Sequence, residues 1–217
     1  MSSNDDILSY LQMSFEDIYA LDRQLDVRDF LVQPEVRDSI PGHVKGLPEQ
    51  FFVSENDEGM ELALFIEPEI ISGLEADDPR RSLHVGNLEN FWIAAEGVSH
   101  FIFLVWRAQL GRPVTHLELE LQAEVDKFVR GWTLLVEQGA SMDEAASALH
   151  RVLFKRYELR NDLPEEQWQM YHAASKAAER FCYRLGQEFS RRHELDAMRR
   201  RVRDYYRLGL SEKMRAA

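Results

Sequence analysis

The chain has 217 residues, of which 45% are hydrophobic and 11% are aromatic, and this composition excludes a largely disordered protein. A chain of this length buries roughly 70% of its extended surface on folding, so it needs neither a metal nor a disulfide to fold. The formal net charge of −12 argues against nucleic acid or anionic lipid as a partner, except at a local basic patch.

The first third of the sequence predicts a helix, a loop and a hairpin. Apolar residues at spacings of three and four give residues 5–32 one helical stripe, which an N-cap at Ser14 could divide into two helices. Prolines and glycines mark residues 34–48 as a loop. Alternating apolar residues and an Asn-Asp-Glu-Gly turn predict a β-hairpin near residues 51–66, closed by Pro68 and followed by a polar loop.

Helical periodicity predicts four further helices in the rest of the chain. The first spans residues 88–110, with Asn87 as its N-cap. The next two open with capping boxes that begin at Thr115 and Ser141. The fourth has Pro164 in its first turn, where a proline is tolerated. The short connections imply that these helices are mostly antiparallel neighbours.

The charge is distributed unevenly along the chain. Residues 191–217 contain nine Lys or Arg against four Asp or Glu, a net charge of +5, so residues 1–190 carry −17. We expect a mainly α fold in which residues 1–190 form a single helical domain. This domain is an antiparallel helical bundle of four to five helices with one packed β-hairpin near residues 51–66. We expect residues 191–217 to form a basic C-terminal helical arm, which either protrudes or belongs to the same domain.

The basic C-terminal helix is the main candidate for an interaction surface. Its arginines alternate with apolar residues, a pattern typical of helices that meet an acidic protein or a second copy of the chain. A protein partner or a homo-oligomer is therefore the leading expectation, and nucleic acid is disfavoured by the overall charge. The alternative is that the helix folds back onto the acidic surface of its own chain.

The segment from Phe91 to Trp106 carries only two readily ionisable side chains, Glu96 and His100. Its apolar residues point in every direction around the helix axis, which is typical of a buried central helix. At a spacing of four residues, Glu96 and His100 lie on one side of that helix, about 6 Å apart at Cβ. Gly97 between them suggests the close approach of a neighbouring helix or a local bulge.

A buried carboxylate such as Glu96 needs a charge, a metal or several donors nearby. Glu120 and Glu124 lie four residues apart on the next predicted helix, and His150 lies on the helix after it. Oxygen and imidazole donors suit iron, manganese or zinc. Glu96, His100, Glu120, Glu124 and His150 are therefore the candidate ligands of a divalent metal.

Two other interpretations of the pair stay open. Glu96 could bond His100 or an arginine such as Arg130 or Arg156, which would fix the helix register without any chemistry. The pair could also act as a metal-free acid–base catalyst. Cys182 stands between two aromatic residues of a helix, which is typical of a core thiol rather than a nucleophile.

The location of the protein can be predicted from three features. The single cysteine excludes an intramolecular disulfide and fits a reducing compartment. The N-terminus is acidic and lacks the apolar segment of a secretory signal. The apolar run at 91–106 is shorter than the ~20 residues that cross a bilayer. We therefore expect a cytoplasmic protein without a membrane span.

The sequence contains no phosphate loop, Rossmann glycine pattern, G-x-S-x-G, HExxH or paired CxxC motif. This absence argues against the familiar kinases, dehydrogenases and hydrolases and leaves enzymatic and noncatalytic functions both open. The leading hypothesis is a noncatalytic interaction or regulatory protein. The alternative is a metal-binding helical protein, an oxidoreductase or a hydrolase, whose metal would activate water or dioxygen.

Overall fold

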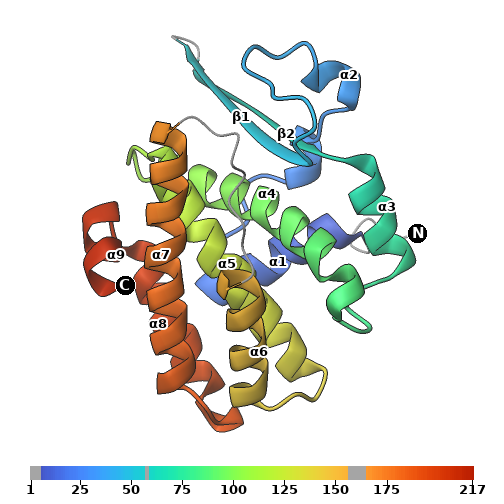
Figure 1. Ribbon diagram of the computed structural model, residues 1–217. Helices are drawn as coiled ribbons and strands as arrows, with labels where there is room; N and C mark the ends of the chain where they lie inside the picture. The colour runs from blue at the N-terminus through green and yellow to red at the C-terminus, as the bar shows by residue number, and fades with distance from the viewer. Residues whose placement is uncertain (1–5, 57–58, 156–164) are drawn as a thin grey trace.

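The computed structural model describes residues 6–56, 59–155 and 165–217 and has a mainly α fold with one β-hairpin (Figure 1). The predicted fold class, a helical bundle with a packed hairpin, is confirmed. Two long helices, α4 (Val85–Gln109) and α5 (His116–Glu137), lie against each other at the centre. Both are largely buried, which agrees with the apolar circumference predicted for the first of them.

The other helices cover these two central ones. Helix α5 also packs against α6 and α7, whereas α4 packs against α1 and α3 on its other side (Figure 1). Helix α8 packs against α1. The bounds of these helices are α1 Ile7–Tyr19, α3 Pro68–Ala76, α6 Met142–Lys155, α7 Glu165–Glu188 and α8 Leu195–Arg207.

The N-terminal helical stripe ends earlier than predicted. Asp6 caps α1 by accepting hydrogen bonds from the backbone N–H groups of Leu8 and Ser9. Ala20 takes the left-handed conformation, with φ 50°, and this ends the helix. A 3₁₀ turn at Val27–Phe30 and the four-residue helix α2 (Pro34–Arg37) follow, so the predicted loop contains a short helix.

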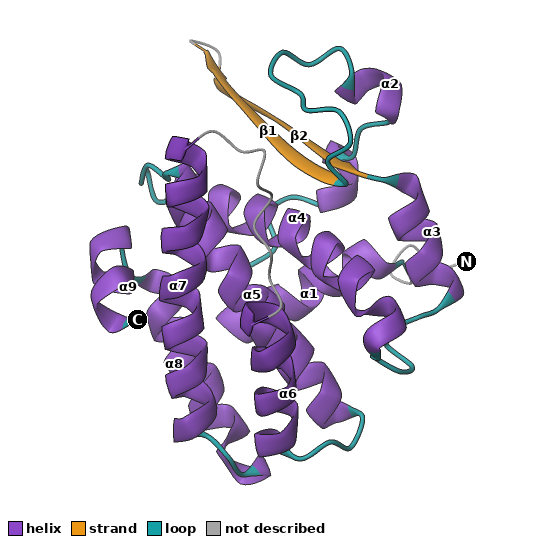
Figure 2. Cartoon of the chain, viewed as in Figure 1, coloured by secondary structure: helices purple, strands orange, loops and turns teal. Residues whose placement is uncertain are grey.

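The hairpin consists of β1 (Glu49–Asn56) and β2 (Gly59–Ile66), paired antiparallel, and lies across one side of the bundle (Figure 2). Asp57 and Glu58 of the predicted turn lie outside the described residues. Pro68 closes the hairpin and also opens α3, which was not predicted, and the predicted polar loop follows α3 at residues 77–84. The N–H of the first helical residue has no partner within the helix, so a proline, which lacks this N–H, is well tolerated there. Pro68 can therefore end the strand and also begin the helix.

The beginnings of the central helices show which capping signals hold. Thr115 caps α5 as predicted, and its hydroxyl accepts from the N–H of Glu118. Asn87 is not the N-cap of α4: the ring of His84 accepts from Gly86, and the Asn87 side chain accepts from the N–H of His84. The two side chains thus form a reciprocal capping box, and α4 begins three residues earlier than expected. Pro164 lies outside the described residues.

The basic C-terminal residues form α8 and α9 (Leu210–Ala216), which lie beside α1 and α7. Tyr206 of α8 stacks on Tyr19 at 3.9 Å between ring centroids. Arg203 and Arg207 donate hydrogen bonds to backbone carbonyls at the end of α1, namely those of Asp17, Ile18 and Tyr19. The carbonyl of Asp17 also accepts from the backbone N–H of Ala20, and the arginines supply the further donors that complete the C-terminus of α1.

Within the described part of the chain, no helix combines the length and the apolar character that crossing a bilayer requires.

Candidate metal centre

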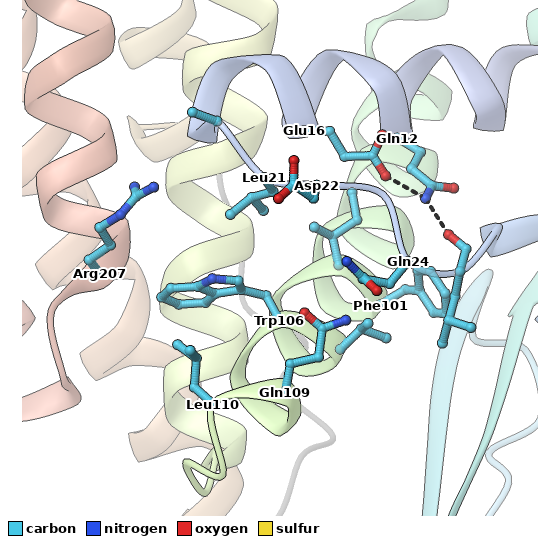
Figure 3. A pocket seen from close by; sticks show the side chains of 14 residues that line it. Gln12, Glu16, Leu21, Asp22, Gln24, Phe101, Trp106, Gln109, Leu110 and Arg207 are labelled. Carbon is cyan, nitrogen blue, oxygen red and sulfur yellow. Dashed lines mark hydrogen bonds between the residues drawn. The ribbon is translucent and has the colours of Figure 1, made fainter.

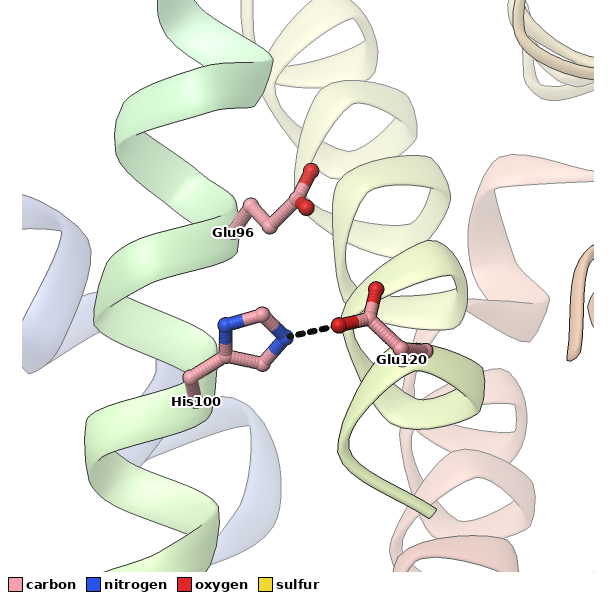
Figure 4. Close-up of side chains that lie close together, drawn as sticks. All are labelled: Glu96, His100 and Glu120. Atoms are coloured by element: carbon pink, nitrogen blue, oxygen red, sulfur yellow. Dashed lines mark ion pairs between the residues drawn. The ribbon is translucent and has the colours of Figure 1, made fainter. Parts of the chain in front are cut away.

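Three side chains converge between α4 and α5. Glu96 and His100 project from one side of α4 toward Glu120 on α5 (Figure 4). Each offers one ligand atom, and the three atoms all lie within 4.8 Å of one another. His100 is 5% exposed and Glu120 is 7% exposed, so both side chains are largely shielded from bulk water.

The hairpin supplies a fourth side chain, which the sequence patterns did not indicate. Glu49, at the start of β1, places its Oε1 atom 3.5 Å from Nδ1 of His100. This approach depends on Gly97 of α4, because a Cβ there would stand 2.9 Å from Leu64 and 3.1 Å from Glu49. The close neighbour that the glycine indicated is therefore the hairpin and not another helix.

Lys127 is the principal cation of this group. Its ammonium donates to Oε2 of Glu96 at 2.8 Å and to Oε1 of Glu124 at 2.6 Å, and the residue is 5% exposed. The sequence suggested an arginine in this role. Arg130 instead contacts Tyr10, Thr133 and Glu137, and Arg156 lies outside the described residues.

These side chains together hold more negative than positive charge. We call them the carboxylate cluster, which comprises Glu49, Glu96, His100, Glu120, Glu124 and Lys127. Four carboxylates face one ammonium and one imidazole, and several buried atoms have no hydrogen-bond partner among the described residues. These atoms are Oε1 of Glu49, Oε2 of Glu124 and Nε2 of His100. Nε2 of His100 lies 3.8 Å from Oε1 of Glu120, which is beyond hydrogen-bond distance.

The pKa values reflect this imbalance. Burial raises the pKa of the Glu49 and Glu124 carboxyls, and neighbouring carboxylates add to the effect. Burial also opposes the charge on Glu96, but the Lys127 ammonium outweighs it and lowers the pKa of that carboxyl. For His100, the surrounding glutamates outweigh burial and raise the imidazole pKa to about 9.

Two partly exposed side chains lie at the edges of the cluster. The side chain of Glu96 is 28% exposed. His116, in the first turn of α5, is 57% exposed and places Nε2 3.0 Å from Oε1 of Glu120. His116 precedes Glu120 by four residues, a spacing that places the two side chains on the same face of α5.

The predicted ligands are distributed over two places. Glu96, His100 and Glu120 come together, and Glu124 joins them through Lys127. His150 is not brought to this cluster. It lies between α6 and α7, where Nε2 is 3.4 Å from the carbonyl oxygen of Glu179. The carboxylate and imidazole donors that do converge are those that bind iron, manganese and zinc.

Comparisons of this chain with protein-family models, with curated proteins and with solved structures found no match.

Proposed function

We propose that this protein binds a divalent metal ion through Glu96, His100 and Glu120, while Glu49 orients the His100 ring from its Nδ1 side. The observation that carries the proposal is the convergence of two carboxylates and one imidazole from α4 and α5 within 4.8 Å. Iron, manganese and zinc are the metals whose ligand preferences match this donor set.

The unsatisfied atoms of the carboxylate cluster support the same conclusion. Buried polar groups in folded proteins almost always have a partner, so each exception requires an explanation. A divalent cation would give Nε2 of His100 the partner it lacks, and it would offset the excess of negative charge. Lys127 bonds only one oxygen of Glu96, and it therefore leaves that carboxylate able to act as a ligand.

The exposed side of the cluster determines what the metal could do. The side chain of Glu96 is 28% exposed, so a metal held by it would be accessible from solvent, and a water bound there would be acidified and polarised by the ion. Hydrolysis or oxygen chemistry at an open coordination position is therefore the class of activity that this proposal includes.

A noncatalytic interaction function has less support. The sequence argument for an interaction function depends on the C-terminal helix. The apolar face of that helix, α8, is buried against the rest of the chain. Arg203 and Arg207 of that helix bond backbone carbonyls of α1, so part of the basic charge already has an internal partner. A docking role for α8 would require it to leave α1.

Metal content, measured by inductively coupled plasma mass spectrometry, tests the proposal. The protein is purified without a tag or chelator and incubated separately with iron(II), manganese(II) and zinc. We expect near-stoichiometric retention of at least one metal after gel filtration, and its loss in His100→Gln and Glu120→Gln. The matched controls are His193→Gln and Glu89→Gln, which alter exposed residues outside the cluster and should retain the metal.

The absence of retained metal in the wild-type protein under all three conditions would refute the proposal. Circular dichroism of every variant separates loss of ligands from loss of fold. If metal binds the wild type and the His100→Gln and Glu120→Gln variants equally well, the site lies elsewhere.

A further inference from the structure

A second cavity, of about 240 Å³, lies between α6 and α7, away from the carboxylate cluster. Its floor includes Phe128 of α5. Ser147, His150 and Arg151 line it from α6, and Tyr183 and Gln187 line it from α7. This cavity accounts for His150, which the sequence singled out and which the proposed metal centre does not use.

Helical spacing directs these side chains into one space. Ser147 and Arg151 are four residues apart on α6, with His150 between them at the same face, and Tyr183 and Gln187 are four apart on α7. The helices approach closely at Gly186, where an added Cβ would stand 3.3 Å from Cβ of Ala146. Two pairs of polar side chains therefore face each other across a narrow floor.

The lining of this cavity is rich in hydrogen-bond donors. A hydroxyl, an imidazole, a guanidinium, a phenol and an amide surround it, and none of its described lining residues is acidic. This is unusual for a chain with 38 Asp and Glu. A groove of about 210 Å³ between α1 and α4 gives the contrast, because Glu16 and Asp22 line it together with Arg207 (Figure 3).

The aromatic residues indicate the shape of a ligand. The rings of His150 and Tyr183 are 5.6 Å apart, and Tyr183 is 55% exposed, so its ring stands at the mouth with a face open to solvent. Such a ring can stack on a planar group. The volume is below the usual range for drug-sized ligands, and it suits a small molecule.

We propose that the cavity between α6 and α7 binds a small phosphate ester with a planar ring. Arg151 and Ser147 bind the phosphate oxygens, as charged and neutral donors respectively, and Tyr183 stacks on the ring. Arg180, three residues before Tyr183 on α7, adds positive charge on the same side of that helix. The proposal does not depend on the metal centre, since none of these residues belongs to it.

Binding of phenyl phosphate, inorganic phosphate and benzyl alcohol tests this proposal, with each titration monitored by protein NMR at constant ionic strength. We expect saturable binding of phenyl phosphate, at least fivefold weaker binding of inorganic phosphate, and the weakest binding of the uncharged alcohol. Arg151→Gln should weaken phenyl phosphate at least tenfold, and Tyr183→Ala should abolish its advantage over inorganic phosphate. Arg112→Gln, an exposed arginine elsewhere, is the matched control.

Three outcomes would overturn the proposal. The first is no saturable binding of either phosphate compound to the wild-type protein. The second is equal binding to the wild type and to Arg151→Gln, which would place the anion elsewhere. The third is benzyl alcohol binding as tightly as phenyl phosphate, which would make the cavity an apolar site without a role for its donors.

Discussion

Helices α4 and α5 carry two buried polar clusters that differ in how well their atoms are satisfied. One is the carboxylate cluster. The other, the aspartate network, comprises Tyr19, Ser99, Gln122, Asp126 and Lys213. The two clusters are adjacent in sequence, because Ser99 precedes His100 and Asp126 precedes Lys127. One residue turns a helix by about 100°, so these neighbours face different sides of the interface.

The aspartate network is complete. The Asp126 carboxylate accepts hydrogen bonds from Tyr19, Ser99 and Gln122. Lys213 of α9 donates to Oε1 of Gln122 at 2.7 Å, and its ammonium lies 4.2 Å from the centre of the Phe103 ring. Across the described residues, every buried side-chain atom of this network has a partner, whereas three residues of the carboxylate cluster have atoms that lack one.

This difference teaches which cluster holds the fold and which one is prepared for a ligand. A fully satisfied buried network specifies a single packing arrangement. A buried group with excess charge and unpaired atoms lowers stability, and proteins retain such groups mainly at functional sites. Burial raises the pKa of both carboxyls, so the contrast lies in hydrogen bonding: loss of the Asp126 acceptor should lower stability, whereas an amide at Glu49 should not.

The largest effect is expected for Asp126→Ala. The change leaves the hydroxyls of Tyr19 and Ser99 buried without their acceptor and removes one of the two acceptors of the Gln122 amide, and we expect a loss of about 3–5 kcal/mol in the free energy of unfolding. Urea denaturation in the presence of a chelator measures it. Asp204→Ala, at an exposed position of α8, should change stability by less than about 0.5 kcal/mol. A loss below about 1 kcal/mol for Asp126→Ala would mean that the network does not hold the fold.

Lys127→Met should separate stability from metal binding in the carboxylate cluster. In the absence of metal, Glu96 and Glu124 lose their buried cation, and we expect a loss of about 3 kcal/mol. With the like charge gone, the metal should bind roughly tenfold more tightly, since nearby unit charges interact by at least about 1 kcal/mol. Calorimetric titration with zinc measures this. Weaker zinc binding in a folded variant would contradict the ligand assignment.

The sequence predicted the bundle better than it predicted the cluster. Periodicity and capping boxes locate α4 and α5, and adjacency of these helices was enough to bring Glu120 toward Glu96 and His100. Glu49 could not be assigned in this way, because it lies about 50 residues away on a strand whose packing leaves no local pattern. Gly97 is the local sequence feature that indicated a close neighbour at this position.

Lys127 and His150 show a second limit of sequence reasoning. The helical phase of each residue can be read from periodicity, but the neighbour that the residue faces depends on how the bundle is assembled. Lys127 lies among apolar residues of α5, and it contacts Glu96 because α4 packs against α5 at that position. His150 faces α7 and not α4, so similar chemistry at a helical spacing did not imply proximity.

Lys213→Met should reveal the charge state of the aspartate network. Burial lowers the pKa of Lys213 from 10.5 to about 7, although Glu118 and Asp126 oppose the shift. At this site the folded protein then holds fewer protons than the unfolded chain between pH 7 and 10.5, so the Lys213 contribution to stability rises with pH across this range. His100, whose pKa is raised to about 9, contributes the opposite slope below that pH in both proteins. The variant lacks this rise, and the difference should be on the order of 2 kcal/mol or more. Parallel slopes for the two proteins in urea titrations would contradict the buried-lysine assignment.

The smallest and most discriminating effect is expected for Glu49→Gln. Burial and the nearby carboxylates raise the pKa of Glu49, so its charge opposes folding, and an amide should stabilise the metal-free protein by about 0.5–1 kcal/mol. The same change removes the carboxylate that faces Nδ1 of the His100 ligand and should weaken zinc binding at least tenfold. Glu61→Gln, at an exposed position of β2, should change neither property. If Glu49→Gln destabilises the metal-free protein and leaves zinc binding unchanged, Glu49 serves the fold as Asp126 does, and the contrast between the two clusters fails at the hairpin.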